Sequence, residues 1–332
     1  MSTERDDQEM THQEHAQLIT KLPKASGWIQ QHVYLYQGNW LVSETILGVM
    51  LMQKHFKHRS SDIFLTAFMK SGTTWLRSLM FSILNRSQFD FSKHPLLHQG
   101  PHGVFPPFDS YVFKDYPMTN MDVIPSPRLF ATHIAHSLFP SAMTNPSSGC
   151  KFVYVCRDPK DVFVSKFHFS KELRPKTLPP ISFDQAFELF CEGVSEYGPY
   201  WDHVLGFWRA SLESPNNILF LKYEEIKKEP EVHVKKLADF MGVPISAEEH
   251  ENGIVEEIVK LCSFEHMKNL EVNKTGIQRF DHGREIENRH FFRQGLVGDW
   301  KRHLTKEMGE RIDRITQEKF KGSGLTLGVN RE

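Results

Sequence analysis

The segment AFMKSGTTWLR combines a lysine, a glycine and three hydroxyl side chains between two apolar runs. Lys70 would supply a full positive charge, and Gly72 lets the backbone pass close to a ligand because it has no Cβ. The amides of Ser71 to Thr74 would open the next helix, where unpaired N–H groups attract anions. The familiar P-loop, G-x-x-x-x-G-K-[ST], places its lysine after a second glycine, whereas Lys70 precedes the only glycine here. The segment predicts a phosphate-binding loop. The alternative is a helix-capping turn beside a solvent-exposed lysine.

A second anion site is indicated in CRDPKDVFVS, which continues from the apolar run KFVYVC. Arg157 takes the position where a metal-dependent NTPase would carry an acid, and a guanidinium there suits phosphate. Asp158 is better explained as a helix N-cap, followed by Pro159 at the first helical position. Ser165 lies two helical turns further along the same helix. The alternative is a structural pair between the arginine and a carboxylate. Two anion sites without a metal-binding acid argue against a kinase or an ATPase and suggest a nucleotide with a second phosphate elsewhere, as on its ribose.

A third anion candidate lies near the C-terminus in HFFRQGLVGDW. Arg293 offers a guanidinium, and Gly295 allows a close approach of the backbone. The preceding TGIQRFDHGREIENRH is polar and aperiodic, which predicts a flap that closes over a nucleotide. A simple turn after a loop is the alternative for this segment.

A general base is sought among eighteen histidines, most of which must be surface or core residues. His133 follows the apolar run PRLFAT, and its unperturbed pKa near 6.5 suits removal of a hydroxyl proton. His136 is a rival three residues later. The position of His133 at the end of a run favours it, and Tyr223 ends a further run, NILFLKY, in the same way.

The elements that would position these side chains are four short apolar runs separated by helical patterns. Near-continuous apolar runs suit buried parallel strands, and the alternation with helices predicts an α/β domain with a central parallel sheet flanked by helices. Ligands bind at the carboxyl ends of such strands, where a lysine loop, an imidazole, a guanidinium and a phenol would meet. The runs span residues 62–68, 127–132, 151–156 and 217–223.

Composition narrows the class of protein. The chain has 332 residues and a net charge of -1, so bulk attraction to nucleic acid or to an anionic membrane is not indicated. There is no secretory signal pattern and no apolar run of the ~20 residues that span a bilayer. Four scattered cysteines without C-x-x-C favour neither disulfides nor zinc, so we expect a cytoplasmic protein. The polar start predicts a disordered tail over residues 1–15 and one domain over 16–328.

With these motifs in place, the chain resembles the soluble (cytosolic) sulfotransferases, most closely the plant flavonol and steroid type. The resemblance runs from LPKASGW to EKFKGSG and is carried by KSGTTW, RDPKDVFVS and FFRQGLVGDW in this order and spacing. It implies a single domain that moves a sulfuryl group from 3′-phosphoadenosine 5′-phosphosulfate (PAPS) to a hydroxyl without a metal. The loop around Lys70 would then hold one terminal phosphosulfate, and its lysine would also be catalytic. The histidine of the ATH segment would be the general base, which selects His133.

The resemblance also implies a set of nucleotide contacts. Ser71 to Thr74 would cradle the 5′-phosphosulfate, the arginine and serine of RDPKDVFVS would hold the 3′-phosphate, and the FRQG segment would return to that phosphate. Two aromatic rings would lie against adenine. The cofactor-binding residues so implied are Lys70, Ser71, Gly72, Thr73, Thr74, Trp75, Arg157, Ser165, Tyr223, Arg293, Gln294 and Gly295.

The chain departs from the family pattern at four positions. Met69 replaces a proline before the loop, which would loosen it by up to ~1 kcal/mol of preorganisation, and Gln294 replaces a lysine near the nucleotide. Ala131 stands two residues before the base, as in plant members. Lys306 replaces an apolar valine in the dimer motif of animal members, so we expect a monomer.

The acceptor side of the site is expected to be apolar. The stretch PHGVFPPFDSYVF and the twenty-six phenylalanines would line an apolar pocket for a flavonoid, a steroid such as a brassinosteroid, or another phenol of plant specialised metabolism. The alternative is that most rings are core. Two other functions stay open: a catalytically inactive adenine-nucleotide-binding protein on the same fold, and a P-loop-type small-molecule kinase that needs Mg²⁺.

Overall fold

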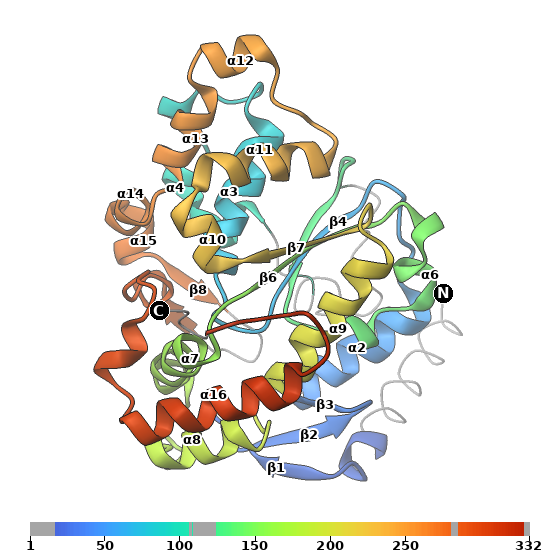
Figure 1. The fold of residues 1–332 in the computed structure, drawn as a ribbon, viewed down its shortest axis with the longest axis vertical. Helices are drawn as coiled ribbons and strands as arrows, with labels where there is room; N and C mark the ends of the chain where they lie inside the picture. The colour runs from blue at the N-terminus through green and yellow to red at the C-terminus, as the bar shows by residue number, and fades with distance from the viewer. Residues whose placement is uncertain (1–16, 106–107, 109–123, 280–284, 329–332) are drawn as a thin grey trace, which may run out of the picture.

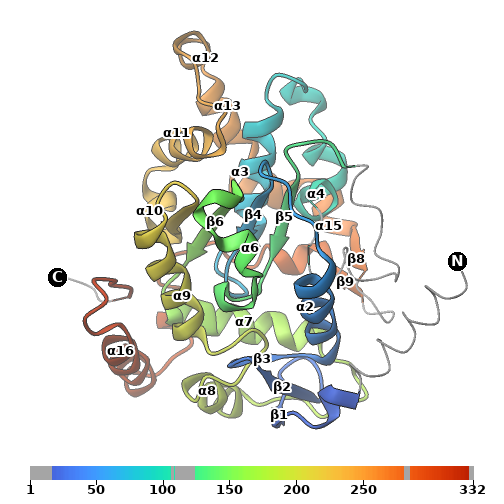
Figure 2. The same ribbon diagram turned by 90° about the vertical axis from the view of Figure 1, so that its right-hand side faces the viewer.

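The computed structural model describes residues 17–105, 108, 124–279 and 285–328, so the tail expected over residues 1–15 lies outside it. A parallel four-stranded sheet runs through the centre in the order β5-β4-β6-β7 (Figures 1 and 2). All four apolar runs form its strands, so the predicted α/β class with a central parallel sheet is confirmed. The strands are β4 Ile63–Thr66, β5 Leu129–Thr132, β6 Lys151–Cys156 and β7 Ile218–Lys222.

Side chains alternate between the two faces of this sheet, and each face builds its own core. One face carries an aromatic ladder, in which Phe64 stacks against Phe130 and Phe152 with ring centroids 5.2 Å apart in both pairs. The other face is aliphatic and includes Leu65 and Val153. Burial on both faces explains why the strand sequences are apolar throughout instead of alternating.

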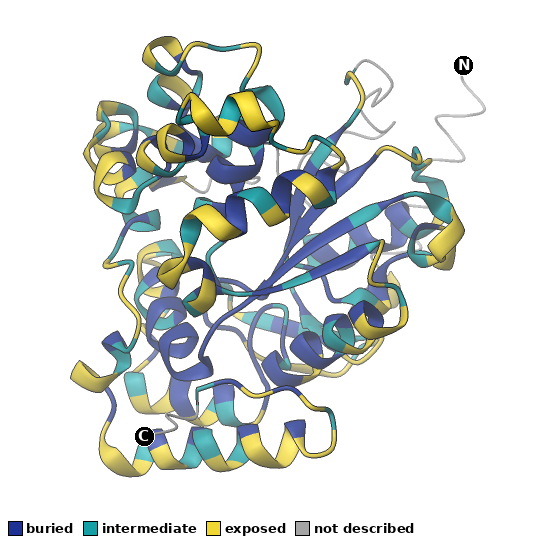
Figure 3. Cartoon of the chain, turned by 45° about the horizontal axis from the view of Figure 1, so that its top comes forward, coloured by how far each residue is buried: buried dark blue, intermediate teal, exposed yellow. Residues whose placement is uncertain are grey.

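Helices cover both faces, with the buried residues concentrated between helices and sheet (Figure 3). The aliphatic face packs against α3 Thr73–Asn85, α11 Pro230–Met241 and α13 Ile254–Leu261. The aromatic face shares its core with residues of α2 Ser43–His55, α7 Pro159–Leu173, α8 Phe183–Cys191, α9 Tyr200–Glu213 and α16 Lys306–Phe320. Helix α8 packs against α7, and α16 packs against α7 and α9. No helix in the described part of the chain is long and apolar enough to cross a membrane.

The helix ends follow the expected capping chemistry. The Asp158 carboxylate accepts a hydrogen bond from the Lys160 amide at 2.8 Å, and Pro159 is the first residue of α7, as predicted. Gly242 ends α11 with a left-handed φ of 80°. The N-cap of α7 matters for the site because it fixes the direction in which Arg157 leaves β6.

Several short elements were not predicted because they are too short to show a periodicity. A three-stranded antiparallel sheet precedes the central sheet along the chain, and a two-stranded antiparallel sheet, β8–β9, lies within the segment that we expected to be a flap. Residues 280–284 of that segment are not among those that the structure describes. The further elements are β1 Lys24–Ser26, β2 His32–Tyr36, β3 Asn39–Leu41, β8 Ile277–Arg279, β9 Glu285–Glu287, η6 Asn288–Phe291, η7 Asp299–Arg302, α4 Leu96–Val104, α6 Ser141–Thr144, α10 Tyr223–Lys228, α12 Ala247–Glu251, α14 Phe264–Asn269 and α15 Glu271–Thr275.

Candidate active site

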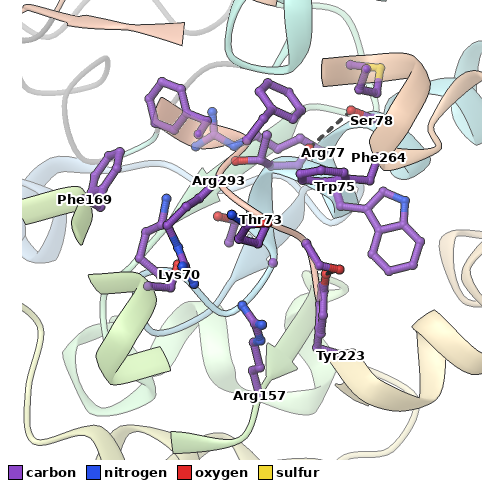
Figure 4. Close-up of a pocket in the computed structure, with 18 of the residues that line it drawn as sticks. Lys70, Thr73, Trp75, Arg77, Ser78, Arg157, Phe169, Tyr223, Phe264 and Arg293 are labelled. Carbon is purple, nitrogen blue, oxygen red and sulfur yellow. Dashed lines mark hydrogen bonds between the residues drawn. The ribbon is translucent and has the colours of Figure 1, made fainter. Parts of the chain in front are cut away.

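The polar side chains at the strand ends meet in one pocket (Figure 4). They come from the β4–α3 loop, the end of β5, the start of α7, the start of α10 and the segment after η6. Of the predicted site residues, only Ser71 does not line the pocket, because its side chain is fully buried beneath the loop. The predicted residues that line it are Lys70, Gly72, Thr73, Thr74, Trp75, His133, Arg157, Ser165, Tyr223, Arg293, Gln294 and Gly295.

The β4–α3 loop is tightly wound. Lys70 has a φ of 69° and Gly72 a φ of 118°, both in the left-handed region. A Cβ at Gly72 would lie 2.7 Å from Cδ2 of Tyr223, so glycine is required both for the turn and for the approach of the ring. Helix α3 then begins at Thr73, which directs the unpaired amides of its first turn into the pocket.

Lys70 lies among aromatic rings and other cations. Its Nζ is 3.8 Å from the centroid of Phe169 and 5.7 Å from that of Phe291. Burial first, and then the charges of Arg293 and Arg157, together lower the pKa of Lys70 to about 7. No carboxylate of the described residues lies within ion-pair distance of this Nζ. The position favours an anionic ligand that would restore its charge.

The two arginines are anchored but keep donors for a ligand. Arg157 donates through Nη2 to the Leu296 carbonyl at 2.5 Å and to Asp161 at 3.2 Å, so part of the structural ion pair considered above is present. Arg293 pairs with Asp299 at 2.7 Å. The Nε atoms of both arginines are buried without a hydrogen-bond partner among the described residues. Orphaned buried donors of this kind call for an acceptor.

Tyr223 joins the two halves of the site. It is the first residue of α10 and lies one position beyond the observed end of β7, whereas we predicted it as the last residue of the strand. Its ring makes an edge contact with Trp75 at 5.7 Å and lies under the Arg157 guanidinium at 4.6 Å. Its hydroxyl donates to the Gly295 carbonyl at 3.2 Å. The tyrosine therefore ties the C-terminal segment to the β4–α3 loop.

His133 has the orientation that a base requires. Its Nδ1 lies 2.8 Å from the Ala67 carbonyl, which can only accept, so Nδ1 carries the proton and Nε2 the lone pair of the neutral ring. Burial is the main cause that lowers the pKa of His133 to about 3, which keeps the ring neutral. His136 does not line the pocket, and its ring packs instead against Phe207 at 5.2 Å.

A chain of hydrogen bonds that supports the backbone of His133 was not predicted from the sequence. His203 lies with Nε2 2.9 Å from the His133 carbonyl, and its Nδ1 accepts from the Tyr154 hydroxyl at 2.8 Å. Because a carbonyl can only accept, this arrangement fixes the tautomer of His203 and holds the backbone of the candidate base. Nothing in the local sequence signals it, because the three residues come from β5, β6 and α9.

Further pocket residues were not among the predicted site residues, and they include Arg77, His102, Phe169 and Phe291. Arg77 could have been found, since it lies one helical turn beyond Thr73 on α3. His102 belongs to the stretch PHGVFPPFDSYVF, which we expected to line an acceptor pocket and of which only residues 101–105 and 108 are described. Phe291 belongs to the motif HFFRQGLVGDW, whereas Phe169 enters the pocket through tertiary packing that no spacing in the sequence signals.

The sequence matches a known protein family over most of its length. A model of the sulfotransferase domain family matches residues 60–324. The chain belongs to the sulfotransferase family. It is 46% identical over 96% of its length to cytosolic sulfotransferase 12 of Arabidopsis thaliana, 95% of which is covered. It is 43% identical over 94% of its length to a flavonol 4′-sulfotransferase of Flaveria chlorifolia, 96% of which is covered.

Solved structures of sulfotransferases share the fold. The structure of an Arabidopsis thaliana protein described as a candidate steroid sulphotransferase has a TM-score of 0.72 at 40% identity, with 94% of both chains covered. A mouse sulfotransferase solved with PAP has a TM-score of 0.65 at 26% identity, with 88% of this chain and 95% of that chain covered. The sulfotransferase resemblance, the fold class and the enzyme class expected from the sequence are confirmed.

Proposed function

We propose that this sulfotransferase moves a sulfuryl group from PAPS to a hydroxyl of a small apolar acceptor. The observation that carries the proposal is the convergence of three cations, Lys70, Arg157 and Arg293, on a pocket that also holds the neutral imidazole of His133. The mouse neighbour, which holds PAP in its crystal structure, supports the choice of nucleotide.

The residues present fit the two charged ends of PAPS. Lys70 and the first amides of α3 would hold the 5′-phosphosulfate, since this part of the pocket has positive charge without a carboxylate partner in the described chain. The unsatisfied Nε atoms of Arg157 and Arg293 would hold the 3′-phosphate, together with Ser165. The adenine would lie against Trp75, whose indole nitrogen is buried without a partner in the described residues, and against the tyrosine beside it.

The reaction would be an in-line displacement at sulfur. As the acceptor oxygen forms its bond to sulfur, the hydroxyl proton passes to Nε2 of His133, and the bond from sulfur to the 5′-phosphate oxygen breaks. Lys70 and the α3 N-terminus would stabilise the charge that gathers on the departing phosphate. His133 would start each cycle neutral because its burial opposes protonation. No residue in this sequence of events needs a metal.

The departures from the family pattern have local explanations. Met69 is buried, and its sulfur lies 3.8 Å from Nζ of Lys166, so packing would replace the rigidity of a proline before the loop. Gln294 lines the pocket as an exposed neutral residue. The side chain of Lys306 is 84% exposed, and a charge there disfavours the apolar contact of the animal dimer, so we propose a monomer.

The acceptor class and the location are proposed from the relatives. Similarity to a flavonol sulfotransferase and to a candidate steroid sulphotransferase favours a flavonoid or a steroid, including a brassinosteroid, as acceptor. Phe169 and Phe291 would give the pocket an apolar wall for a planar ring system. We propose a cytoplasmic location because the similar plant enzymes are named cytosolic.

The proposal is tested by incubating the protein with sulfur-labelled PAPS and a panel of phenols, flavonoids and steroids in the presence of a chelator. Label on an acceptor supports the proposal. Transfer from ATP that stops when the chelator is added would identify a kinase instead. Tight binding of PAP with no labelled product from any acceptor would identify an inactive nucleotide-binding protein.

A further inference from the structure

A second histidine, His102, lines the pocket from helix α4. His102 lies near the end of α4, two residues beyond a kink at Gly100, where φ is 68° and ψ is 174°. A Cβ at Gly100 would lie 2.8 Å from the side-chain oxygen of Asn273 on α15, so the kink packs closely against that helix. The kink turns the end of α4 towards the pocket, and the ring of His102 lies against Phe291 with centroids 3.9 Å apart.

His102 has the properties of a neutral hydrogen-bonding group that waits for a ligand. It is half-buried and lines the same pocket as Lys70 and His133. Burial, followed by the charges of Arg77, Lys70 and His133, holds its pKa well below the usual range, so the ring stays uncharged. Neither ring nitrogen is hydrogen-bonded to another residue in the described part of the chain. A neutral imidazole offers one donor and one acceptor.

We propose that His102 binds the acceptor and hydrogen-bonds a second oxygen on it, while His133 takes the proton of the reacting hydroxyl. This assignment rests on the proposed function. Its consequence is a preference for acceptors that carry two oxygen substituents on one planar ring system, such as polyphenols, over alcohols with a single hydroxyl. Because a neutral imidazole has one donor and one acceptor, His102 could pair with either a hydroxyl or a carbonyl as the second oxygen.

The position of His102 separates this role from nucleotide binding. It lies on α4, whereas the predicted nucleotide contacts come from the β4–α3 loop, α7, α10 and the segment after η6. The rings of His102 and Phe291 lie near Lys70, since the centroid of the Phe291 ring is 5.7 Å from the Nζ atom of Lys70. An acceptor ring placed against this pair would bring its substituents towards the loop from which the sulfuryl group leaves.

Two variants distinguish the hydrogen-bonding role of His102 from the packing of its ring against Phe291. His102→Phe keeps an aromatic ring against Phe291 and removes both hydrogen-bonding atoms, whereas His102→Gln keeps a donor and an acceptor and removes the ring. The acceptors are 2-naphthol and a series of naphthalenediols that place a second hydroxyl at successive ring positions. Both kcat/KM with PAPS and the Kd of each acceptor for the enzyme–PAP complex, by calorimetry, are measured for each variant.

We expect the wild-type enzyme to prefer at least one diol over 2-naphthol, in kcat/KM and in Kd alike. His102→Phe should abolish that preference, with a loss of about tenfold on the diol and less than about twofold on 2-naphthol. His102→Gln should retain part of it, and the Kd of PAP alone should stay within about twofold in both variants.

Three results would overturn the assignment: no preference in the wild type, equal losses on both acceptors, or weaker PAP binding in His102→Phe. Equal losses would indicate a packing role for the ring, and weaker PAP binding would indicate a nucleotide contact. A wild-type protein that sulfates nothing but still binds the preferred diol through His102 would refute the proposed function and leave this binding role standing.

Discussion

The lowered pKa of Lys70 makes nucleotide affinity depend on pH. Burial and the neighbouring arginines bring this pKa to about 7 in the protein without ligand. A bound anion favours the charged amine and raises the pKa, so binding takes up a proton and affinity is lost as the pH rises above 7. A free pKa of 7 gives a loss in PAP affinity of about eightfold between pH 7.5 and 8.5, and uptake of about 0.8 proton per PAP at pH 7.5.

The matched control is Lys70→Arg, which keeps a positive charge that does not titrate in this range. Isothermal titration calorimetry of PAP at pH 7.0 to 9.0, in buffers with different ionisation enthalpies, measures both the Kd and the proton uptake. The phosphates of PAP are essentially fully ionised above pH 7.5, since their second pKa lies near 6, so the ligand charge stays constant. The Lys70→Arg protein should show a nearly flat Kd and no uptake.

A wild-type Kd that stays flat from pH 7.5 to 9.0 without proton uptake would refute the reasoning, because Lys70 would then be charged before the ligand arrives. A wild-type slope that persists in Lys70→Arg would assign the titration to another group.

Three further predictions concern the base, the loop and the packing behind it. His133→Ala should lower kcat by at least ~100-fold and leave the Kd of PAP within about twofold, whereas the control His136→Ala should change neither; equal losses in the two variants would argue against the assigned base. Gly72→Ala places a Cβ 2.7 Å from a tyrosine ring at a φ of 118°, so the Kd of PAP should rise more than about tenfold by calorimetry, and an unchanged Kd would show that the loop can relax. Glu196→Gln leaves the fully buried Lys166 without its 2.7 Å counter-ion and should lower the free energy of unfolding in urea by ~3–5 kcal/mol. Adding Lys166→Met should restore much of that loss, and a double variant no more stable than the single one would contradict the explanation.

The central sheet could be predicted because its strands are buried on both faces. Such strands leave a continuous apolar run in the sequence, and the observed bounds of β6 equal the predicted ones. The strands of β1–β3 and β8–β9 have three to five residues and half-exposed patterns, so no alternation distinguishes them from loops. The segment that we expected to be a flap contains β8 and β9, which pair with each other, and β9 also contacts α7 and α15, which no local pattern signals.

Some residues of the candidate site could likewise be inferred from the sequence, and others could not. Lys70, His133 and Arg157 follow strands directly, and a parallel sheet must bring such residues to one edge, so their meeting could be inferred from the sequence. His102 and Phe291 belong to segments that we expected near the site, but their contact could not be inferred, because it depends on a backbone kink at Gly100 and on packing between elements far apart in the chain. Local sequence carries the first kind of information and not the second.

The central claim is that the loop around Lys70 receives the 5′ end of the nucleotide while the arginines receive its 3′-phosphate. A crystal structure of the protein with PAP tests this most directly. We predict the 5′-phosphate within hydrogen-bond distance of Lys70 and the first amides of α3, and the 3′-phosphate against Arg157 and Arg293. PAP bound away from Lys70, or with its two phosphates exchanged between these positions, would contradict the account.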